Sequence, residues 1–185
     1  MRPRTRSDTA TMTRARLELC ASIRHRTIKM TSLAAPIPRT EVQMELQQIL
    51  QQYHSAADEF ARGDAEPVKK LFSHRDDVTL ANPFGPAVCG WKNVSNALTF
   101  ASSRFRDGAV TSFEPVAEYV GSDLATILET ERWSAKVSGR ADVTPFVLRV
   151  TSTFRREDGT WKLVHRHADP IATPHPDGPL RSLES

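Results

Sequence analysis

The chain has 185 residues, 39% hydrophobic and 25% charged, which is ordinary globular usage and enough to bury a sizeable core. Residues 1–40 hold nine basic and two acidic residues, so the totals of 25 and 22 leave 16 basic against 20 acidic residues for 41–185. That acidic remainder is not expected to bind nucleic acid, and no apolar run approaches the ~20 residues that cross a membrane. Two cysteines do not make a disulfide framework and indicate a reducing cytoplasm.

Residues 1–39 are predicted to lie outside the folded domain. They are rich in Arg, Ser and Thr and lack apolar periodicity. The composition fits a disordered basic tail, an organellar transit peptide, or an extension from a start codon assigned too early, since Met12 and Met30 are also plausible starts. A disordered tail or a spurious extension is favoured. The Pro-rich segment 171–185 is predicted to be irregular, which leaves 40–170 as the domain.

Three helices are predicted. Thr40-Glu41-Val42-Gln43 fits a capping box, and an apolar stripe at three- and four-residue spacing follows as far as Gly63. This stripe consists of Leu46, Ile49, Leu50, Tyr53, Ala56, Ala57 and Phe60. Asp64 can cap a short second helix, and a third helix starts at Trp91 and stops at Asp107-Gly108.

Strands are predicted from about residue 109 onwards, at about 109–120, 123–137, 143–156 and 160–169. Their separators are short enough for antiparallel hairpins, and Pro115 indicates a bulge or an edge position. A shorter strand, Val78–Ala81, ends at the turn-forming segment Asn82-Pro83-Phe84-Gly85-Pro86. Helices followed by antiparallel strands predict an α+β fold with the helices on one face of a curved sheet. A cavity is expected between the two layers.

The last predicted strand combines apolar and ionisable residues. Alternation places Trp161, Leu163, His165, His167 and Asp169 on one face. Such a strand is expected to floor a pocket, with packing at its start and polar groups at its end. A core strand with a solvated end would show the same pattern.

These features together resemble the SnoaL-like branch of the nuclear transport factor 2-like superfamily, which also includes ketosteroid isomerase-like proteins. The resemblance covers about residues 41–170. It rests on the order of helices and strands, on Asn82-Pro83-Phe84-Gly85-Pro86 followed by Gly90-Trp91, and on the closing segment Arg155–Asp169.

The resemblance implies a cone-shaped α+β barrel roll of the cystatin-like type, in which a curved antiparallel sheet wraps around about three helices. It also implies a pocket between sheet and helices, and frequent homodimers. It does not imply one reaction, because members include isomerases, cyclases, dehydratases, epoxide hydrolases and non-catalytic modules.

His167 and Asp169 are the first candidates for catalysis. Successive same-face positions lie ~6.6 Å apart, so Asp169 can orient the His167 ring and raise its basicity, giving an acid/base near neutral pH. Two histidines can also share a metal ion, but His165 and Asp169 start ~13 Å apart on the strand, and no metal is expected. The alternative is that the histidines only form structural hydrogen bonds.

Glu129 and Glu131 share one face of the 123–137 strand. If this face lines the cavity, a partly buried glutamate would have a raised pKa and could act as an acid or base. If it is the outer face, which is favoured because carboxylates are seldom buried unpaired, the glutamates are solvated or pair with Arg149 or Arg132. Arg149 could anchor a carboxylate or enolate oxygen in the pocket, or form a salt bridge with one of these glutamates.

Asn82, Phe84 and Trp91 are predicted to lie at the pocket mouth, where the aromatic rings would contact an apolar ligand, although core packing explains Phe84 and Trp91 equally well. With the two glutamates they form the predicted substrate-binding set. Asp76-Asp77 resembles the placement of carboxylates near ketosteroid isomerase-like pockets, but an ordinary turn is the preferred interpretation.

The leading hypothesis is a small enzyme without a cofactor that moves protons on a hydrophobic organic molecule, by isomerisation, cyclisation, dehydration or hydration. His167 would be the acid/base, Asp169 its orienting partner, and His165 or Arg149 the electrostatic partner. The competing hypothesis is a non-catalytic ligand-binding or dimerisation domain with the same cavity. The two differ in whether His167 and Asp169 point into the cavity.

Overall fold

A computed structural model describes residues 39–170, and these lie within one compact unit. The predictions for the basic segment before Arg39 and for the segment 171–185 fall outside the described residues. None of the helices between residues 39 and 170 is long and apolar enough to cross a membrane.

The described part of the chain contains three helices, α2 (Arg39–Ala61), α3 (Glu66–Leu71) and α4 (Trp91–Ser102). The predicted apolar stripe explains α2, because Leu46, Tyr53 and Ala57 on this stripe are all buried. The helix starts at Arg39, one residue before the predicted cap. Gly63 follows its end with a φ of +104°, a backbone conformation that favours glycine.

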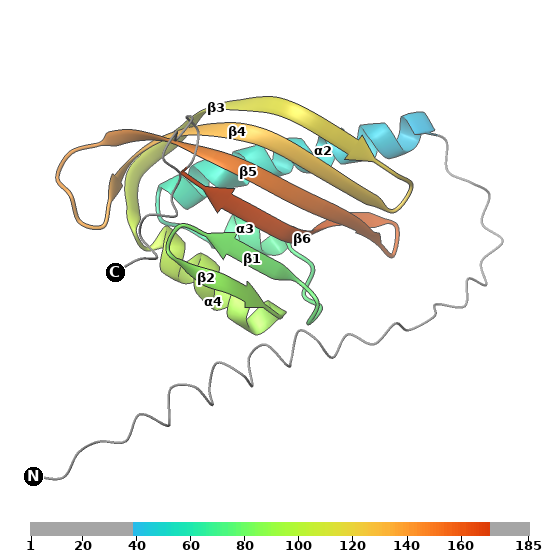
Figure 1. Cartoon of the computed structure of the whole chain (residues 1–185), viewed down its shortest axis with the longest axis horizontal. Coiled ribbons are helices and arrows are strands. Elements are labelled where there is room, and N and C mark those ends of the chain that lie inside the picture. Colours follow the sequence, from blue (N-terminus) through green and yellow to red (C-terminus); the bar gives the residue numbers. More distant parts are fainter. Residues whose placement is uncertain (1–38, 171–185) are drawn as a thin grey trace, which may run out of the picture. The chain divides into compact units, whose positions relative to one another are not determined.

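Six strands form one curved, mixed sheet in the order β2-β1-β6-β5-β4-β3 (Figure 1). The strands are β1 (Thr79–Asn82), β2 (Gly85–Cys89), β3 (Phe105–Val120), β4 (Leu124–Val137), β5 (Thr144–Glu157) and β6 (Thr160–Asp169). Neighbouring strands are antiparallel except β1 and β6, which are parallel. The predicted α+β class is confirmed. The sheet differs from the prediction in this parallel pair and in β2, which forms where only a turn was expected.

The helices cover one face of the sheet, called here the inner face. Helix α2 packs against β3, β4 and β6, and α4 packs against β1 and β2 (Figure 1). On β4, burial alternates along the strand, and the buried inner-face set is Ala125, Ile127, Glu129, Glu131, Trp133 and Ala135. The opposite, outer face carries the more exposed residues of the same strand, among them Arg132. The core and any enclosed site therefore lie between α2 and the inner face.

The edge strand β3 shows the irregularity that Pro115 predicted. Its register with β4 shifts between Pro115 and Ala117, and β3 has a neighbour on one side only. Proline is tolerated at a bulge in an edge strand, because its missing N–H is not needed there for a hydrogen bond to a neighbouring strand. Both parts of the prediction are confirmed.

Candidate functional site

A cavity of about 400 Å³ lies between the helices and the inner face of the sheet, a size that suits a small organic ligand. Its interior is lined by buried residues of α2, α4, β4 and β5. Its mouth is marked by the exposed lining residues of the β1–β2 turn, the β4–β5 loop with the start of β5, and the residue after β6. These are Pro83, Ser138, Arg140, Thr144 and Pro170.

Aromatic rings form much of the cavity wall. The rings of Phe105 and Phe146 stack with centroids 5.8 Å apart at 12°, and those of Trp133 and Phe146 stack at 5.9 Å and 21°. Phe84 meets Phe105 edge-on, with centroids 5.4 Å apart. Flat, rigid walls of this kind favour a ligand with rings or another extended apolar body.

A buried polar network borders this cavity and centres on Glu131, which has no exposed surface. The Tyr53 hydroxyl donates a hydrogen bond to Glu131 Oε1 over 2.7 Å, and Trp133 Nε1 donates to Oε2 over 2.9 Å. Arg166 donates from Nη2 to Glu131 Oε2 over 2.8 Å and from Nε to the Tyr53 oxygen over 2.7 Å. Glu131 therefore accepts three hydrogen bonds, and its charge is paired.

Burial fixes the protonation of the two cavity-lining members of this network. Burial raises the pKa of the Tyr53 phenol well above its ordinary value of 10.0, so the phenol keeps its proton. For Arg166, burial alone would lower the pKa, but the nearby Glu131 and the Tyr53 oxygen outweigh it and raise the pKa above its ordinary value. The inner wall of the cavity thus presents a permanent cation beside a neutral phenol.

One donor of this cation remains available. Arg166 Nη1 donates no hydrogen bond within residues 39–170 and is not closed off by protein atoms, and the Arg166 side chain lines the cavity. No Asp, Glu or His lines the cavity in the same part of the chain. Nor do three or more His, Cys, Asp or Glu side chains gather into a possible metal site between residues 39 and 170.

Glu129 lies on the inner face two residues before Glu131 and is 3% exposed. Its Oε2 lies 3.2 Å from His54 Nε2, and its Oε1 is buried without a hydrogen-bond partner among the described residues. The favoured prediction that these glutamates lie on the outer face is wrong, because both are paired and buried beneath α2. Neither lines the cavity directly, so their substrate-binding role stays a prediction.

A β-bulge in β6 decides where the predicted catalytic residues lie. Leu163 pairs with Phe154, which is fully buried, whereas His165 pairs with Thr153, the preceding residue of β5. Paired residues share a face, and neighbouring residues of a strand point to opposite faces. Leu163 and His165 therefore lie on opposite faces, and Val164 is the extra residue of the bulge.

The bulge reverses the predicted faces for the second half of β6. Arg166 and Ala168 turn to the inner face, while His165, His167 and Asp169 turn to the outer face. The prediction that these three share a face with the apolar start of the strand is wrong, since one extra residue moves every later side chain to the other side. None of them lines the cavity.

The structure does bring three of the predicted residues together on the outer face. Asp169 Oδ2 lies 2.8 Å from Arg149 Nη2 and 3.8 Å from His167 Nε2, and the His167 side chain is 52% exposed. His165 Nδ1 hydrogen-bonds with Thr79 Oγ1 over 2.7 Å, and burial, followed by the charge of His167, lowers the pKa of its ring. The catalytic role of this group stays a prediction.

Two of the three predicted mouth residues line the cavity. Asn82 and Phe84 line the cavity, but Trp91 does not, and its ring stacks on His74 with centroids 3.9 Å apart. The sequence interpretation missed Tyr53 and Arg166 as site residues. Tyr53 was assigned to the apolar stripe of a helix, and Arg166 reaches the cavity only because of the bulge.

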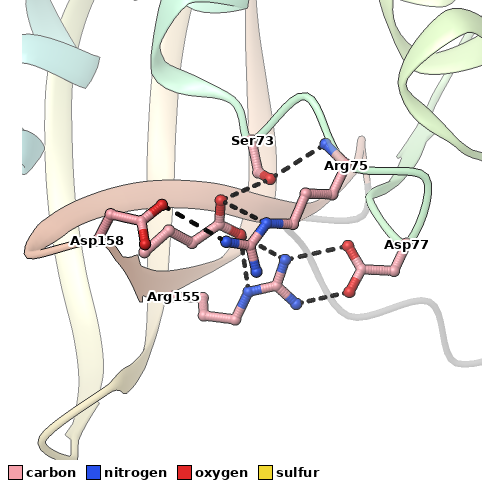
Figure 2. A network of polar contacts seen from close by, with 6 residues as sticks. Ser73, Arg75, Asp77, Arg155 and Asp158 are labelled. Atoms are coloured by element: carbon pink, nitrogen blue, oxygen red, sulfur yellow. Dashed lines mark hydrogen bonds and ion pairs between the residues drawn. The ribbon is translucent and has the colours of Figure 1, made fainter. Parts of the chain in front are cut away.

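Asp77 belongs to a surface ion network rather than to the cavity (Figure 2). Arg155 donates to both of its carboxylate oxygens, over 2.7 and 3.0 Å, and this hydrogen bonding lowers the Asp77 pKa. Arg155 Nε also donates to Glu157 over 2.9 Å, and Arg75 Nε lies 3.2 Å from the same carboxylate. The network ties the loop before β1 to the β5–β6 hairpin, which agrees with the preferred structural interpretation of Asp77.

The chain was compared with known families, curated proteins and solved structures. The SnoaL-like domain family matches residues 46–173, and no curated protein is significantly similar in sequence. A solved nuclear transport factor 2-like superfamily protein from Salmonella enterica is 18% identical, with a TM-score of 0.64, covering 76% of this chain and 99% of that one.

Two further solved structures share the fold. A ketosteroid isomerase-like protein from Erwinia carotovora atroseptica is 18% identical, with a TM-score of 0.60, covering 74% of this chain and 100% of its own. A nuclear transport factor 2-like protein with a cystatin-like fold from Novosphingobium aromaticivorans is 20% identical, with a TM-score of 0.54, covering 97% and 99%. At these identities the likeness concerns the fold alone, and it confirms the predicted cystatin-like α+β architecture.

Proposed function

Because the chain belongs to the SnoaL-like domain family, we propose that it binds a small, largely apolar organic molecule in the cavity between α2 and the sheet. The observation that carries the proposal is the open Nη1 donor of Arg166 in a wall that is mostly aromatic and aliphatic. A ligand with an apolar body and one oxygen acceptor satisfies both features.

The network around Arg166 supports binding because it fixes the donor before a ligand arrives. Glu131 and Tyr53 hold the guanidinium through Nη2 and Nε, so little side-chain freedom is lost when Nη1 engages an oxygen. A hydrogen bond to a charged group contributes about 1.5–3 kcal/mol. Aromatic contacts add about 0.5–1.5 kcal/mol each beyond the area they bury.

A fluorescent naphthyl ketone tests this proposal. We expect 6-propionyl-2-dimethylaminonaphthalene to bind the protein with a blue-shifted emission, because its ketone can meet Arg166 while its rings leave water. Ala101→Leu, which narrows the cavity from α4, is expected to weaken binding at least about tenfold. Ala87→Leu makes the same change at an exposed site of β2 and should leave affinity unchanged. Equal binding by both variants would place the ligand elsewhere.

A second candidate function is acid–base catalysis without a cofactor, as isomerase, cyclase, dehydratase or hydratase. It is favoured by Arg166, which lines the cavity and could polarise a carbonyl oxygen, while Tyr53 accepts a hydrogen bond from Arg166 Nε and helps to hold the guanidinium in place. The test is exchange of the methyl protons of 2-acetylnaphthalene for deuterium, followed by NMR. If the protein is a catalyst, exchange should be faster than in buffer alone, and Tyr53→Phe should slow it. Exchange at the buffer rate would contradict catalysis, and ligand binding would remain as the proposed function.

We also propose that the protein forms a homodimer through the outer face of the sheet. Tyr119 and Leu124 lie on this face, 68% and 54% exposed, and apolar side chains so exposed are common at interfaces. Light scattering after gel filtration should give twice the chain mass, and Tyr119→Lys should shift it toward the monomer. A monomeric wild type at all concentrations would contradict this.

The cytoplasmic location stays a prediction from the cysteine count.

A further inference from the structure

The charged groups that line the cavity are cationic at both its ends. Arg166 lies at the inner wall and Arg140 at the mouth, and within residues 39–170 no acidic side chain lines the space between them. Arg166 is paired with Glu131. Arg140, in contrast, is exposed and makes no ion pair or side-chain hydrogen bond in the described part of the chain. Arg140 is therefore a guanidinium at the mouth without an ion-pair partner among the described residues, although Asp142 follows in the same exposed loop.

The strand register gives the distance between the two ends. Leu148 of β5 pairs with Glu131, which is the level where the Arg166 guanidinium docks. Thr144, at the mouth, begins β5 four residues earlier, and Arg140 lies in the loop just before it. At ~3.4 Å per residue, Thr144 and Leu148 are ~14 Å apart along the strand. A molecule that spans the cavity thus has about the length of two fused rings with a short side chain.

Electrostatics assigns a different polar group to each end. At the inner end, Arg166 is neutralised by Glu131, and Glu129 is a second buried carboxylate on the same face. An anionic group placed there would face two buried carboxylates, so this end favours a neutral acceptor such as a carbonyl or ether oxygen. At the mouth, Arg140 is exposed, faces no buried carboxylate that lines the cavity and favours an anion.

We propose that the ligand is an amphipathic organic anion, such as a ring-containing carboxylate, with its neutral oxygen at Arg166 and its anionic group at Arg140. This rests on the proposed function, because it names the class of molecule that the same cavity takes. The apolar body lies against the aromatic wall between the two arginines.

Calorimetric titration of 6-methoxy-2-naphthylacetate and of its methyl ester tests the proposal. The two share the rings and the ether oxygen and differ in the negative charge. We expect the wild type to prefer the carboxylate about two- to fivefold, the range for an exposed ion pair, and to lose that preference at high salt. Arg140→Gln should bind both equally, with the affinity for the ester unchanged. Arg132→Gln removes the same charge on the outer face of β4 and should keep the preference.

Each outcome decides a separate claim. Equal affinity of the wild type for both compounds, or a preference that survives in Arg140→Gln, overturns the anionic ligand while the cavity proposal stands. If neither compound binds at all, the cavity does not accept an apolar body and both proposals fall. Because Arg140 is exposed, circular dichroism should show that Arg140→Gln folds as the wild type does.

Discussion

Arg166 Nη2 lies 2.8 Å from Glu131 Oε2, and the two side chains are 11% and 0% exposed. Such a deep ion pair needs further hydrogen bonds to offset the loss of water, and Tyr53 and Trp133 supply them to the Glu131 carboxylate. The pair connects β4 and β6, and Tyr53 links both residues to α2, so it affects the stability of the domain as well as the chemistry of the cavity.

Breaking this pair from one side should be costly. We expect Glu131→Gln to lower the free energy of unfolding by about 3–5 kcal/mol, because it leaves the Arg166 charge buried without its partner. Urea denaturation measures the change. The double variant Glu131→Leu with Arg166→Met should recover more than half of the loss, since no charge then remains to be paired.

An exposed pair of the same types is the control. Glu114→Gln removes the partner of Arg132, where both side chains are about half exposed, and should cost less than about 1 kcal/mol. Similar losses at the two sites would show that burial does not decide the strength of the Glu131 pair.

The pH dependence of stability should carry a contribution from His165. Its pKa lies below the ordinary 6.5, so between the two values the unfolded chain binds more protons than the folded protein. Stability should therefore rise with pH across this interval and gain nothing more from His165 above about pH 6.5. His165→Gln should flatten the rise in urea midpoint with pH below about pH 6.5. An NMR titration giving His165 a pKa at or above 6.5 would contradict the assignment.

The bulge in β6 can be tested by chemical accessibility. In a background with Cys20 and Cys89 replaced by serine, His167→Cys should react with a thiol reagent at nearly the rate of a free peptide, since the side chain is half exposed. Ala168→Cys occupies a site that is 2% exposed and should be strongly protected. Protection of position 167 with reactivity at 168 would restore the regular alternation that the sequence alone suggested.

The sequence predicts the local features of the fold but not the faces of the side chains in the second half of β6. The apolar stripe of α2, the order of elements and the Pro115 bulge follow from periodicity and turn chemistry, which are local. The face of His167 depends on Val164, and nothing about that residue marks a bulge, because the register of β6 is set by its packing against Phe154 of β5. The cavity role of Tyr53 likewise depends on a strand 78 residues away.

Gly108 offers a test of how closely α2 approaches β4. A Cβ at this position would lie 2.5 Å from the Ala61 carbonyl oxygen and 2.8 Å from the Ala135 Cβ. We expect Gly108→Ala to destabilise the protein by about 1–3 kcal/mol through overpacking, measured by thermal or urea unfolding. Gly85→Ala has nothing within 4 Å of the new methyl group and should change stability by less than about 0.5 kcal/mol. Equal effects would indicate a looser helix–sheet contact.

The most direct measurement is the ratio of affinities for 2-acetylnaphthalene and 2-ethylnaphthalene, which differ in one oxygen. If the open Nη1 of Arg166 receives the ligand's oxygen in the apolar cavity, the ketone should bind at least about tenfold more tightly, the effect of one hydrogen bond to a charged donor. A ratio near one, or binding of neither compound, would contradict the account.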